Sequence, residues 1–190
     1  MLDPILLKIA KTAILSRFDD SFVIDKDLLL KEYPFLNKDG ASFVTLNYNG
    51  ALRGCIGSII AHRTLLDDII SNANSAAFSD PRFSPLKTDE LDKLNLEVSV
   101  LTKPELLNYK DYNDLKDKIN AGTDGLILKY GSYQGTFLPQ VWEQLPDKER
   151  FLEHLSYKAG TNPSIYEHNP DIYVYQVDAI EEDFDAVLPL

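Results

Sequence analysis

Cysteine and histidine are scarce in this chain of 190 residues, which contains one cysteine and three histidines. The single cysteine, Cys55, excludes an internal disulfide and any metal site built from several thiolates. His62, His154 and His168 show none of the compact spacings that metal-binding motifs use. The sequence therefore predicts no metal site and no cofactor. A chain without disulfides is also typical of a reducing compartment, so we expect a cytoplasmic protein.

Basic residues are outnumbered, with 19 Lys and Arg against 30 Asp and Glu and a formal net charge of -11. Nonspecific binding of nucleic acid depends on clustered Lys and Arg, so this composition argues against nucleic acid as a partner. Most of the acidic excess falls in residues 96–190. Any surface for an anionic ligand is therefore expected in the first half of the chain.

Long apolar runs are absent as well, so no membrane-spanning segment is predicted. The most apolar stretch is the N-terminal MLDPILLKIAKTAILSRF, where Asp3, Lys8 and Lys11 argue against a signal peptide. Asp3 and Pro4 are residue types that begin helices. We predict a helix over residues 2–17, with a buried stripe formed by Ile5, Leu6, Ile9 and Ala13.

The first half of the chain has the pattern of a hairpin, a helix and a strand. Residues 42–60 predict a β-hairpin, because Asn49-Gly50 supplies the two residues that a type I′ turn requires. Thr64 is the N-cap of the predicted helix, and Asp67 three residues later resembles a capping box. The strand that follows alternates apolar with polar residues, with the apolar ones at Leu96, Val98 and Val100.

The second half repeats this order. Residues 125–139 predict another hairpin, which turns at Gly131-Ser132 or at Gln134-Gly135. A helix begins near residues 146–147 and ends at Gly160. A closing strand follows, with a break near Gln176. Two further helices are predicted over residues 88–94 and 111–121. Two hairpin–helix–strand repeats of this kind predict an α+β fold.

The chemistry of the first half centres on the stretch ALRGCIGSII, in which Cys55 lies between Gly54 and Gly57. A two-residue turn predicts that Cys55 faces Val44 across the hairpin, and that Arg53, Cys55 and Gly57 share one face. A guanidinium next to a thiol favours the thiolate, which is the reactive form. The alternative is that Cys55 packs as a small apolar residue, as free cysteines commonly do. The spacing leaves both interpretations open.

Three other residues are candidates for the same site. Arg82 follows Asp80-Pro81, and it either binds an anionic group or pairs with a carboxylate where the helix ends. Glu97 is either a solvated charge on its strand or a general base. Gln140 lies just beyond the second hairpin, and it hydrogen-bonds either a ligand or the backbone at that corner.

Several segments together resemble the AMMECR family in their order and spacing. They are LRGCIG at 52–57, DPRFSPL at 80–86, LEVSVLTKPE at 96–105, GTDGLIL at 122–128, LPQVW at 138–142 and FLEHLSYKAG at 151–160. The resemblance covers nearly the whole chain. It departs from the family pattern near the C-terminus, where Ser156 stands near a position that is often cysteine in relatives.

The resemblance implies a single α+β domain over residues 1–190. Its two repeats would surround a curved, mainly antiparallel sheet with a small accessory lobe, and a cleft would lie beside LRGCIG. It implies Cys55 and Arg53 as catalytic residues, and ligand-binding roles for Gly54, Gly57, Asp80, Arg82, Glu97 and Gln140. Relatives are often encoded with Memo-type and radical-SAM proteins, which are therefore possible partners in a modification pathway.

Three kinds of function remain open at this point. The first is an enzyme or enzyme subunit that uses Cys55, and the second is a non-catalytic module that binds a protein or a small ligand. The third, direct binding of RNA, needs a local basic patch despite the acidic total. We expect a monomer or a homodimer.

Overall fold

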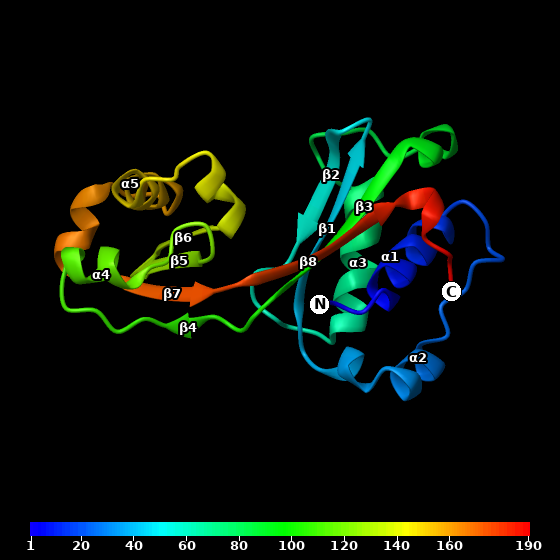
Figure 1. Cartoon of the computed structure of the whole chain (residues 1–190), viewed down its shortest axis with the longest axis horizontal. Helices are drawn as coiled ribbons and strands as arrows, with labels where there is room; N and C mark the ends of the chain where they lie inside the picture. Colours follow the sequence, from blue (N-terminus) through cyan, green and yellow to red (C-terminus); the bar gives the residue numbers. More distant parts are fainter. The chain divides into compact units, whose positions relative to one another are not determined.

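The computed structural model describes residues 1–190, and the polypeptide divides into two units. Unit 1 contains Met1–Leu101 and Asp178–Leu190, whereas unit 2 contains Thr102–Val177. Unit 2 is thus inserted into the sequence of unit 1 (Figure 1). Each unit has its own sheet, its own helices and its own hydrophobic core.

Unit 1 contains a four-stranded sheet in the order β2-β1-β3-β8 (Figure 1). Its strands are β1 (Ala41–Tyr48), β2 (Ala51–Gly57), β3 (Leu94–Leu101) and β8 (Val177–Asp183). Its α-helices are α1 (Ile5–Leu15), α2 (Lys26–Glu32) and α3 (Leu65–Phe78). Short 3-10 helices are η1 (Pro34–Asn37), η2 (Thr88–Lys93) and η5 (Phe184–Ala186).

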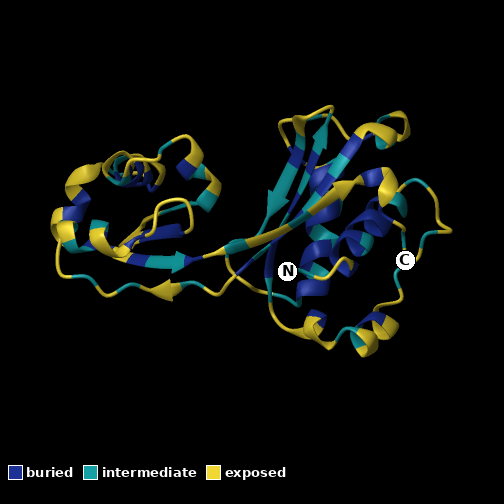
Figure 2. Cartoon of the chain, in the orientation of Figure 1, coloured by how far each residue is buried: buried dark blue, intermediate teal, exposed yellow.

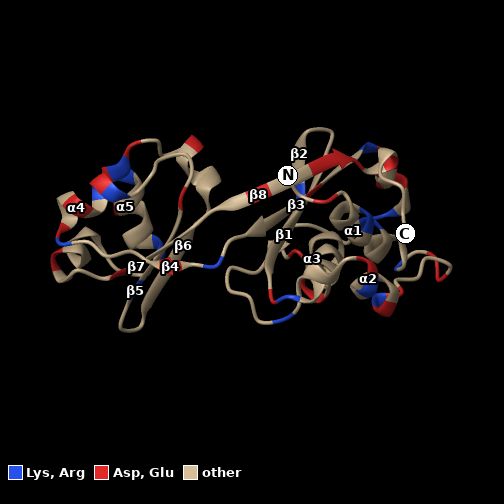
Figure 3. Cartoon of the chain, turned by 60° about the horizontal axis from the view of Figure 1, so that its bottom comes forward, with Lys and Arg blue, Asp and Glu red and all other residues tan.

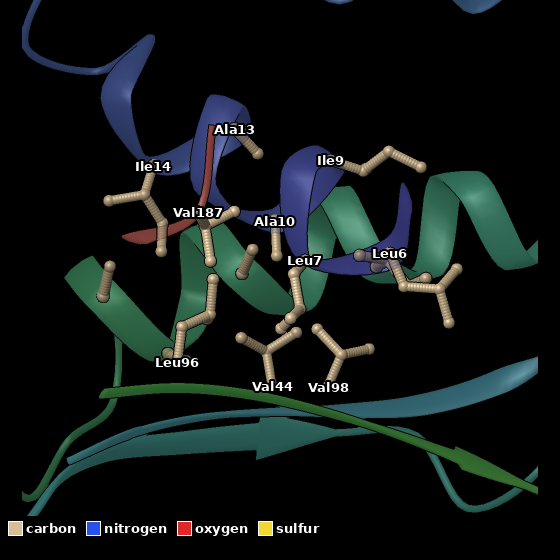
Figure 4. Packing of buried hydrophobic residues seen from close by; sticks show 14 of the residues in the cluster. Leu6, Leu7, Ile9, Ala10, Ala13, Ile14, Val44, Leu96, Val98 and Val187 are labelled. Atoms are coloured by element: carbon tan, nitrogen blue, oxygen red, sulfur yellow. The ribbon is translucent and has the colours of Figure 1, made fainter. Parts of the chain in front are cut away.

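The core of unit 1 lies between one face of this sheet and the helices α1 and α3 (Figure 4). We call this the inner face of the sheet and the opposite side the outer face. The predicted N-terminal helix is confirmed, and its stripe is fully buried at Ile5, Leu6, Ile9 and Ala13. The carboxylate of Asp3 accepts a hydrogen bond of 2.9 Å from the backbone N–H of Ile5, so it satisfies one of the free donors at the helix start.

Helix α3 is also confirmed, including its cap. The hydroxyl of Thr64 accepts a hydrogen bond of 3.2 Å from the backbone N–H of Asp67. The helix ends at Phe78, just before Asp80-Pro81. Its apolar face packs in the core, and the dark blue segments of α1 and α3 in Figure 2 mark these buried residues.

The hairpin between β1 and β2 turns as predicted but pairs differently. Asn49 and Gly50 both have positive φ, at 49° and 79°, as a type I′ turn requires. Beyond the turn the register shifts by one residue, because Leu52 pairs with Asn47 whereas Gly54 pairs with Leu46. Arg53 is therefore the extra residue of a β-bulge. The predicted pairing of Cys55 with Val44 is wrong, and Cys55 pairs with Thr45 instead.

Unit 2 contains the second four-stranded sheet, in the order β4-β7-β5-β6. Its strands are β4 (Glu105–Leu106), β5 (Gly125–Tyr130), β6 (Tyr133–Phe137) and β7 (Asp171–Tyr175). Its helices are α4 (Tyr112–Lys118), α5 (Lys148–Lys158) and the 3-10 helices η3 (Pro139–Glu143) and η4 (Pro163–His168). Of the two predicted turns, Gly131-Ser132 is the one that joins β5 to β6, since Tyr130 pairs with Tyr133.

The core of unit 2 is built around aromatic side chains. The ring of Trp142 stacks on Phe151 of α5, with 3.6 Å between the ring centroids, and its indole N–H donates to the carbonyl of Asp124 at 2.8 Å. The predicted apolar side of α5 is buried at Phe151, Leu152, Leu155 and Ala159. Gly160 follows with a φ of +88°, so the predicted glycine at the helix end is confirmed.

The α+β class is confirmed, and each unit contains a hairpin, a helix and a closing strand in that order. The strands form two antiparallel sheets, where the family resemblance implied one curved sheet. The reason lies at Gln176, where the predicted closing strand divides into β7 of the second sheet and β8 of the first. None of the helices combines the length and the apolar character that a membrane span requires.

Candidate functional site

Cys55 points to the outer face of the sheet in unit 1, away from the core. A Cβ atom added to the neighbouring Gly54 would lie 2.1 Å from the carbonyl oxygen of Ala76 in α3, so Gly54 faces the helix. Successive residues of a strand point to opposite faces, which places Cys55 on the other side. Its side chain is half-buried, and the hydroxyl of Thr45 lies 3.3 Å from its sulfur. Cys55 therefore does not lie in the apolar core, where the packing interpretation would place it.

Asp80 holds the backbone of the cysteine in place. It lies just after α3 and is only 4% exposed. One oxygen of its carboxylate accepts a hydrogen bond of 3.0 Å from the backbone N–H of Cys55. The hydrogen bonds that Asp80 receives from Arg82 and Cys55 keep the pKa of its carboxyl well below the usual range. A buried, ionised carboxylate thus connects the loop after α3 to β2.

Arg82 lies beside the cysteine. Its guanidinium forms a bidentate pair with Asp80, through Nε at 3.0 Å and Nη2 at 2.8 Å. Nη2 also donates to the carbonyl of Cys55 at 3.3 Å. The hydrogen bond to Asp80 is the largest cause of the raised pKa of Arg82, and a negative charge on Cys55 also raises it. Because its side chain remains 54% exposed, Arg82 can still meet a ligand.

The guanidinium of Arg53 is directed toward Glu90. It forms a bidentate pair with Glu90, through Nε at 2.7 Å and Nη2 at 3.1 Å, and the side chain is only 11% exposed. This hydrogen bonding lowers the pKa of Glu90. Arg53 and Arg82 both lie near the ring of Phe83, with their guanidinium carbons 5.9 Å and 5.5 Å from its centroid. Both arginines are thus paired with a carboxylate, but Arg53 is nearly buried, whereas Arg82 is 54% exposed and contacts the backbone of Cys55.

Glu97 shares the outer face with Cys55 but is not adjacent to it. Thr45 pairs with Cys55 on one side and with Glu97 on the other, so the three residues form one row across β2, β1 and β3. Neighbouring strands lie about 4.8 Å apart, which separates the backbones of Cys55 and Glu97 by roughly 10 Å. The carboxylate of Glu97 accepts a hydrogen bond of 3.0 Å from the hydroxyl of Ser99.

The remaining candidates have different positions. Gly57 lies under the ring of Phe43, because a Cβ added there would come within 2.2 Å of it. Gln140 belongs to η3 of unit 2 and is exposed. The structure therefore brings Cys55, Asp80 and Arg82 together in unit 1 and adds Glu97 at the end of the row, whereas Gln140 belongs to the other unit. Across residues 1–190 no three side chains of His, Cys, Asp or Glu are arranged to hold a metal ion.

Sequence reasoning missed three residues of the site, namely Thr45, Phe83 and Glu90. Phe83 carried a partial signal, because it lies in the same DPRFSPL segment as Asp80 and Arg82. Thr45 can be recognised as the partner of Cys55 only when the bulge at Arg53 is known. Glu90 lies in a predicted helical turn among other acidic residues, and nothing in the sequence singles it out.

Comparison with known proteins identifies the family. The AMMECR1 family model matches residues 7–180, which span parts of both units. The chain belongs to the AMMECR1 family. Protein LS215_2104 of Saccharolobus islandicus is 44% identical over 171 residues, which are 86% of this chain and 74% of that protein. A protein of Methanosarcina acetivorans is 41% identical over 150 residues, which are 78% of this chain and 75% of the relative.

A solved structure has the same fold. The crystal structure of uncharacterized protein PH0010 from Pyrococcus horikoshii matches with a TM-score of 0.79 and 36% sequence identity. The match covers 94% of this chain and 90% of PH0010. The comparisons establish the AMMECR1 family and its fold, and they assign no activity.

Proposed function

We propose that this AMMECR1 protein is an enzyme, or an enzyme subunit, that uses the Cys55 thiol as a nucleophile or as an acceptor. The observation that supports this function is the direction of Cys55. The thiol lies on the outer face of the sheet, next to an arginine, instead of in the apolar core. Reactive cysteines have such electropositive and partly exposed surroundings, whereas structural cysteines are buried and inert.

Arg82 is the residue that we assign to the anionic part of a substrate. Asp80 fixes the guanidinium in a bidentate pair, yet more than half of the Arg82 side chain stays open to solvent. A planar guanidinium held in this way can offer its remaining N–H groups to a carboxylate or a phosphate. Arg53 retains an indirect role, since its pair with Glu90 fixes the bulge next to Cys55.

The row of Cys55, Thr45 and Glu97 places a hydroxyl next to the thiol and a carboxylate one strand further on. The Thr45 hydroxyl lies 3.3 Å from the sulfur and can donate a hydrogen bond to a thiolate. Glu97, on the far side of Thr45, is the carboxylate that we assign to acid–base chemistry in this row.

A second candidate function is a non-catalytic module that binds a protein or a small ligand. The observation that favours it is that both arginines of the site are already paired, Arg53 with Glu90 and Arg82 with Asp80. In that case Cys55 would be replaceable while Arg82 would not. The family resemblance implies Memo-type and radical-SAM proteins as partners. We include these partners and a cytoplasmic location in both the enzyme proposal and the binding-module proposal.

The experiment that tests the enzyme hypothesis is alkylation of Cys55, which is a clean assay because the chain has one thiol. Neutral iodoacetamide and anionic iodoacetate are compared at pH 7, in the folded protein and in urea. We expect the folded protein to react faster with both reagents than the unfolded chain does. We also expect iodoacetate to gain about tenfold over iodoacetamide on folding, because Arg82 attracts the anion.

Arg82→Gln is the matched variant for this assay, and Lys87→Gln, which removes a nearby exposed charge, is the control. The iodoacetate preference should disappear in Arg82→Gln and persist in Lys87→Gln. A folded thiol that barely reacts with either reagent would overturn the nucleophile hypothesis and leave the binding module as the better interpretation.

A further inference from the structure

Unit 2 contains a cavity of about 500 Å³, which shares no residue with the Cys55 site. Its wall comes from the segment around β4, the end of α4, the loop before β5, and the end of β7. The residues that line it are Thr102, Lys103, Glu105, Leu106, Leu107, Lys118, Asn120, Asp124, Val174 and Gln176. The cavity is thus built entirely from one unit, and it has both apolar and charged walls.

Asp124 is the most deeply buried charged residue of this wall, with 2% of its surface exposed. One carboxylate oxygen accepts hydrogen bonds from the backbone and side chain of Asn120, at 2.8 Å and 3.3 Å. The other accepts one hydrogen bond of 3.0 Å, from the side-chain amide of Gln176. All of these donors are neutral groups. A carboxylate can accept about four hydrogen bonds, so the oxygen that faces Gln176 retains capacity for another donor.

The ion pairs of unit 2, Lys116–Glu149 and Lys118–Asp114, do not include Asp124, and Lys103 lines the same cavity without forming an ion pair with it. Lys118, the basic residue of α4 in this wall, is committed to the carbonyl of Asn108 at 2.6 Å and to Asp114 at 3.1 Å. Buried charges are normally paired, because an unpaired charge loses its hydration without compensation. A cationic ligand in the cavity would provide the missing partner.

Other acceptors in the cavity point to the same chemistry. The side-chain amide of Gln176 uses its N–H on Asp124, which leaves its carbonyl oxygen as an acceptor. Glu105 of β4 adds an exposed carboxylate. Leu106, Leu107 and Val174 supply an apolar surface along which a short methylene chain can lie.

We propose that this cavity binds a small aliphatic amine, with its ammonium group against Asp124 and Gln176 and its methylene chain along Leu106, Leu107 and Val174. The geometry that carries the proposal is a buried carboxylate with neutral partners at the wall of a cavity large enough for a small molecule. Ligand cavities of this kind combine an apolar lining with a few polar groups that fix orientation. The site is independent of the function proposed for Cys55.

The test is titration of the full chain with 1,4-diaminobutane and, separately, with 1,4-butanediol, by calorimetry and amide chemical shifts in 150 mM NaCl. The salt screens nonspecific attraction to a protein of net charge -11. We expect the diamine to bind and to shift the amides of Asn120, Asp124 and Gln176, and the diol to cause no such shifts. No binding of the diamine at 10 mM, or shifts confined to other regions, would overturn the proposal.

The matched variants are Asp124→Asn and Glu167→Gln, which make the same change of charge inside and outside the cavity wall. We expect the dissociation constant of the diamine to rise at least tenfold in Asp124→Asn and to change less than twofold in Glu167→Gln. Equal binding by a folded Asp124→Asn protein would overturn the proposal. If that variant does not fold, the comparison of diamine with diol in the unmodified chain decides the question alone.

Discussion

At the scale of single residues, Asp80 connects Cys55 to Arg82 through hydrogen bonds. It is buried, and its two oxygens accept hydrogen bonds from the backbone of Cys55 and from both the backbone and the guanidinium of Arg82. The same atoms therefore contribute to the stability of unit 1 and to the geometry of the proposed site. This double role makes the stability of the protein sensitive to acid.

The pH dependence follows from the lowered pKa of Asp80 in the folded state. A carboxyl with a depressed folded pKa stabilises the protein fully above its unfolded value, near pH 4, and the contribution is lost as the pH falls toward the folded pKa. We expect Asp80→Asn to lower the free energy of unfolding by roughly 2 kcal/mol at pH 7, since it removes charged hydrogen bonds. The difference from the unmodified protein should shrink as the pH falls below about 4.

Urea denaturation at a series of pH values measures this effect. Asp89→Asn, which changes an exposed carboxylate of η2, is the control and should differ from the unmodified protein by less than about 0.5 kcal/mol at each pH. A deficit of Asp80→Asn that stayed constant down to pH 2 would contradict the assigned role of its charge.

At the scale of elements, a helix of each unit packs closely against a glycine in the second strand of the hairpin. In unit 1 a Cβ on Gly54 would lie 2.1 Å from the carbonyl oxygen of Ala76 in α3. In unit 2 a Cβ on Gly135 would lie 2.6 Å from the backbone nitrogen of Ala159, directly after α5. Both obstacles are backbone atoms, which cannot move aside without shifting a helix. The two glycines thus set the distance between helix and sheet in corresponding places.

Gly54→Ala and Gly135→Ala should therefore each destabilise the protein, by about 3 kcal/mol, which is the upper range for a methyl group forced into a packed interior. Chemical denaturation measures the loss. Ser132→Ala, in the exposed turn of the second hairpin, is the control and should cost less than about 0.5 kcal/mol. If Gly54→Ala were as stable as the unmodified protein, helix α3 would not need its close approach to β2.

Local features of these elements could be predicted from the sequence, whereas their pairing could not. The Asn49-Gly50 turn, the Thr64 cap and the Gly160 helix end were predictable because each depends on a few adjacent residues. The bulge at Arg53 has no such signature, since it is a feature of how β2 pairs with β1. That single shift moved Cys55 from Val44 to Thr45. It also explains why Thr45 was absent from the predicted site, whereas Glu90 was absent because nothing in the sequence distinguishes it from the acidic residues around it.

The division into two sheets could not be predicted from the sequence either. β4 has two residues and pairs with β7, which follows about 65 positions later, and β8 completes a sheet whose other strands end at Leu101. Such long-range pairing leaves little trace in local periodicity. The proximity of Asp80 and Arg82 to Cys55 was anticipated from the family resemblance, but their hydrogen bonds were not.

At the scale of the whole molecule, the sequence provides one reporter for each unit. Trp142, the only tryptophan, lies in the core of unit 2, and Cys55, the only cysteine, lies on the sheet of unit 1. Unit 1 also depends on the C-terminal segment. Phe184 and Val187 are buried against its core, and their carbonyls accept hydrogen bonds of 2.6 Å and 2.8 Å from the buried Nζ of Lys11. Strand β8, whose Asp and Glu residues are red in Figure 3, leads into this segment.

Ending the chain at Asp183 should thus destabilise unit 1 selectively. The loss of two buried apolar side chains is expected to cost roughly 4 kcal/mol, apart from the acceptors that Lys11 loses. In a urea titration the midpoint for thiol exposure of Cys55 should fall clearly, while the midpoint for Trp142 fluorescence should fall less. Leu188→Ser, at a residue that is 69% exposed, is the control and should move neither midpoint. Equal shifts of the two midpoints would contradict the independence of the units.

The insertion of unit 2 has a consequence for biosynthesis. The chain leaves unit 1 after Leu101 and returns at Asp178, and the two crossing segments are joined where Thr102 donates its N–H to the carbonyl of Gln176 at 2.9 Å. Strands β1, β2 and β3 are therefore synthesised before any residue of unit 2, and β8 is synthesised after all of them. The edge of β3 that pairs with β8 stays open while residues 102–177 are made. An unpaired strand edge favours aggregation, so the nascent protein is exposed to it until β8 has emerged.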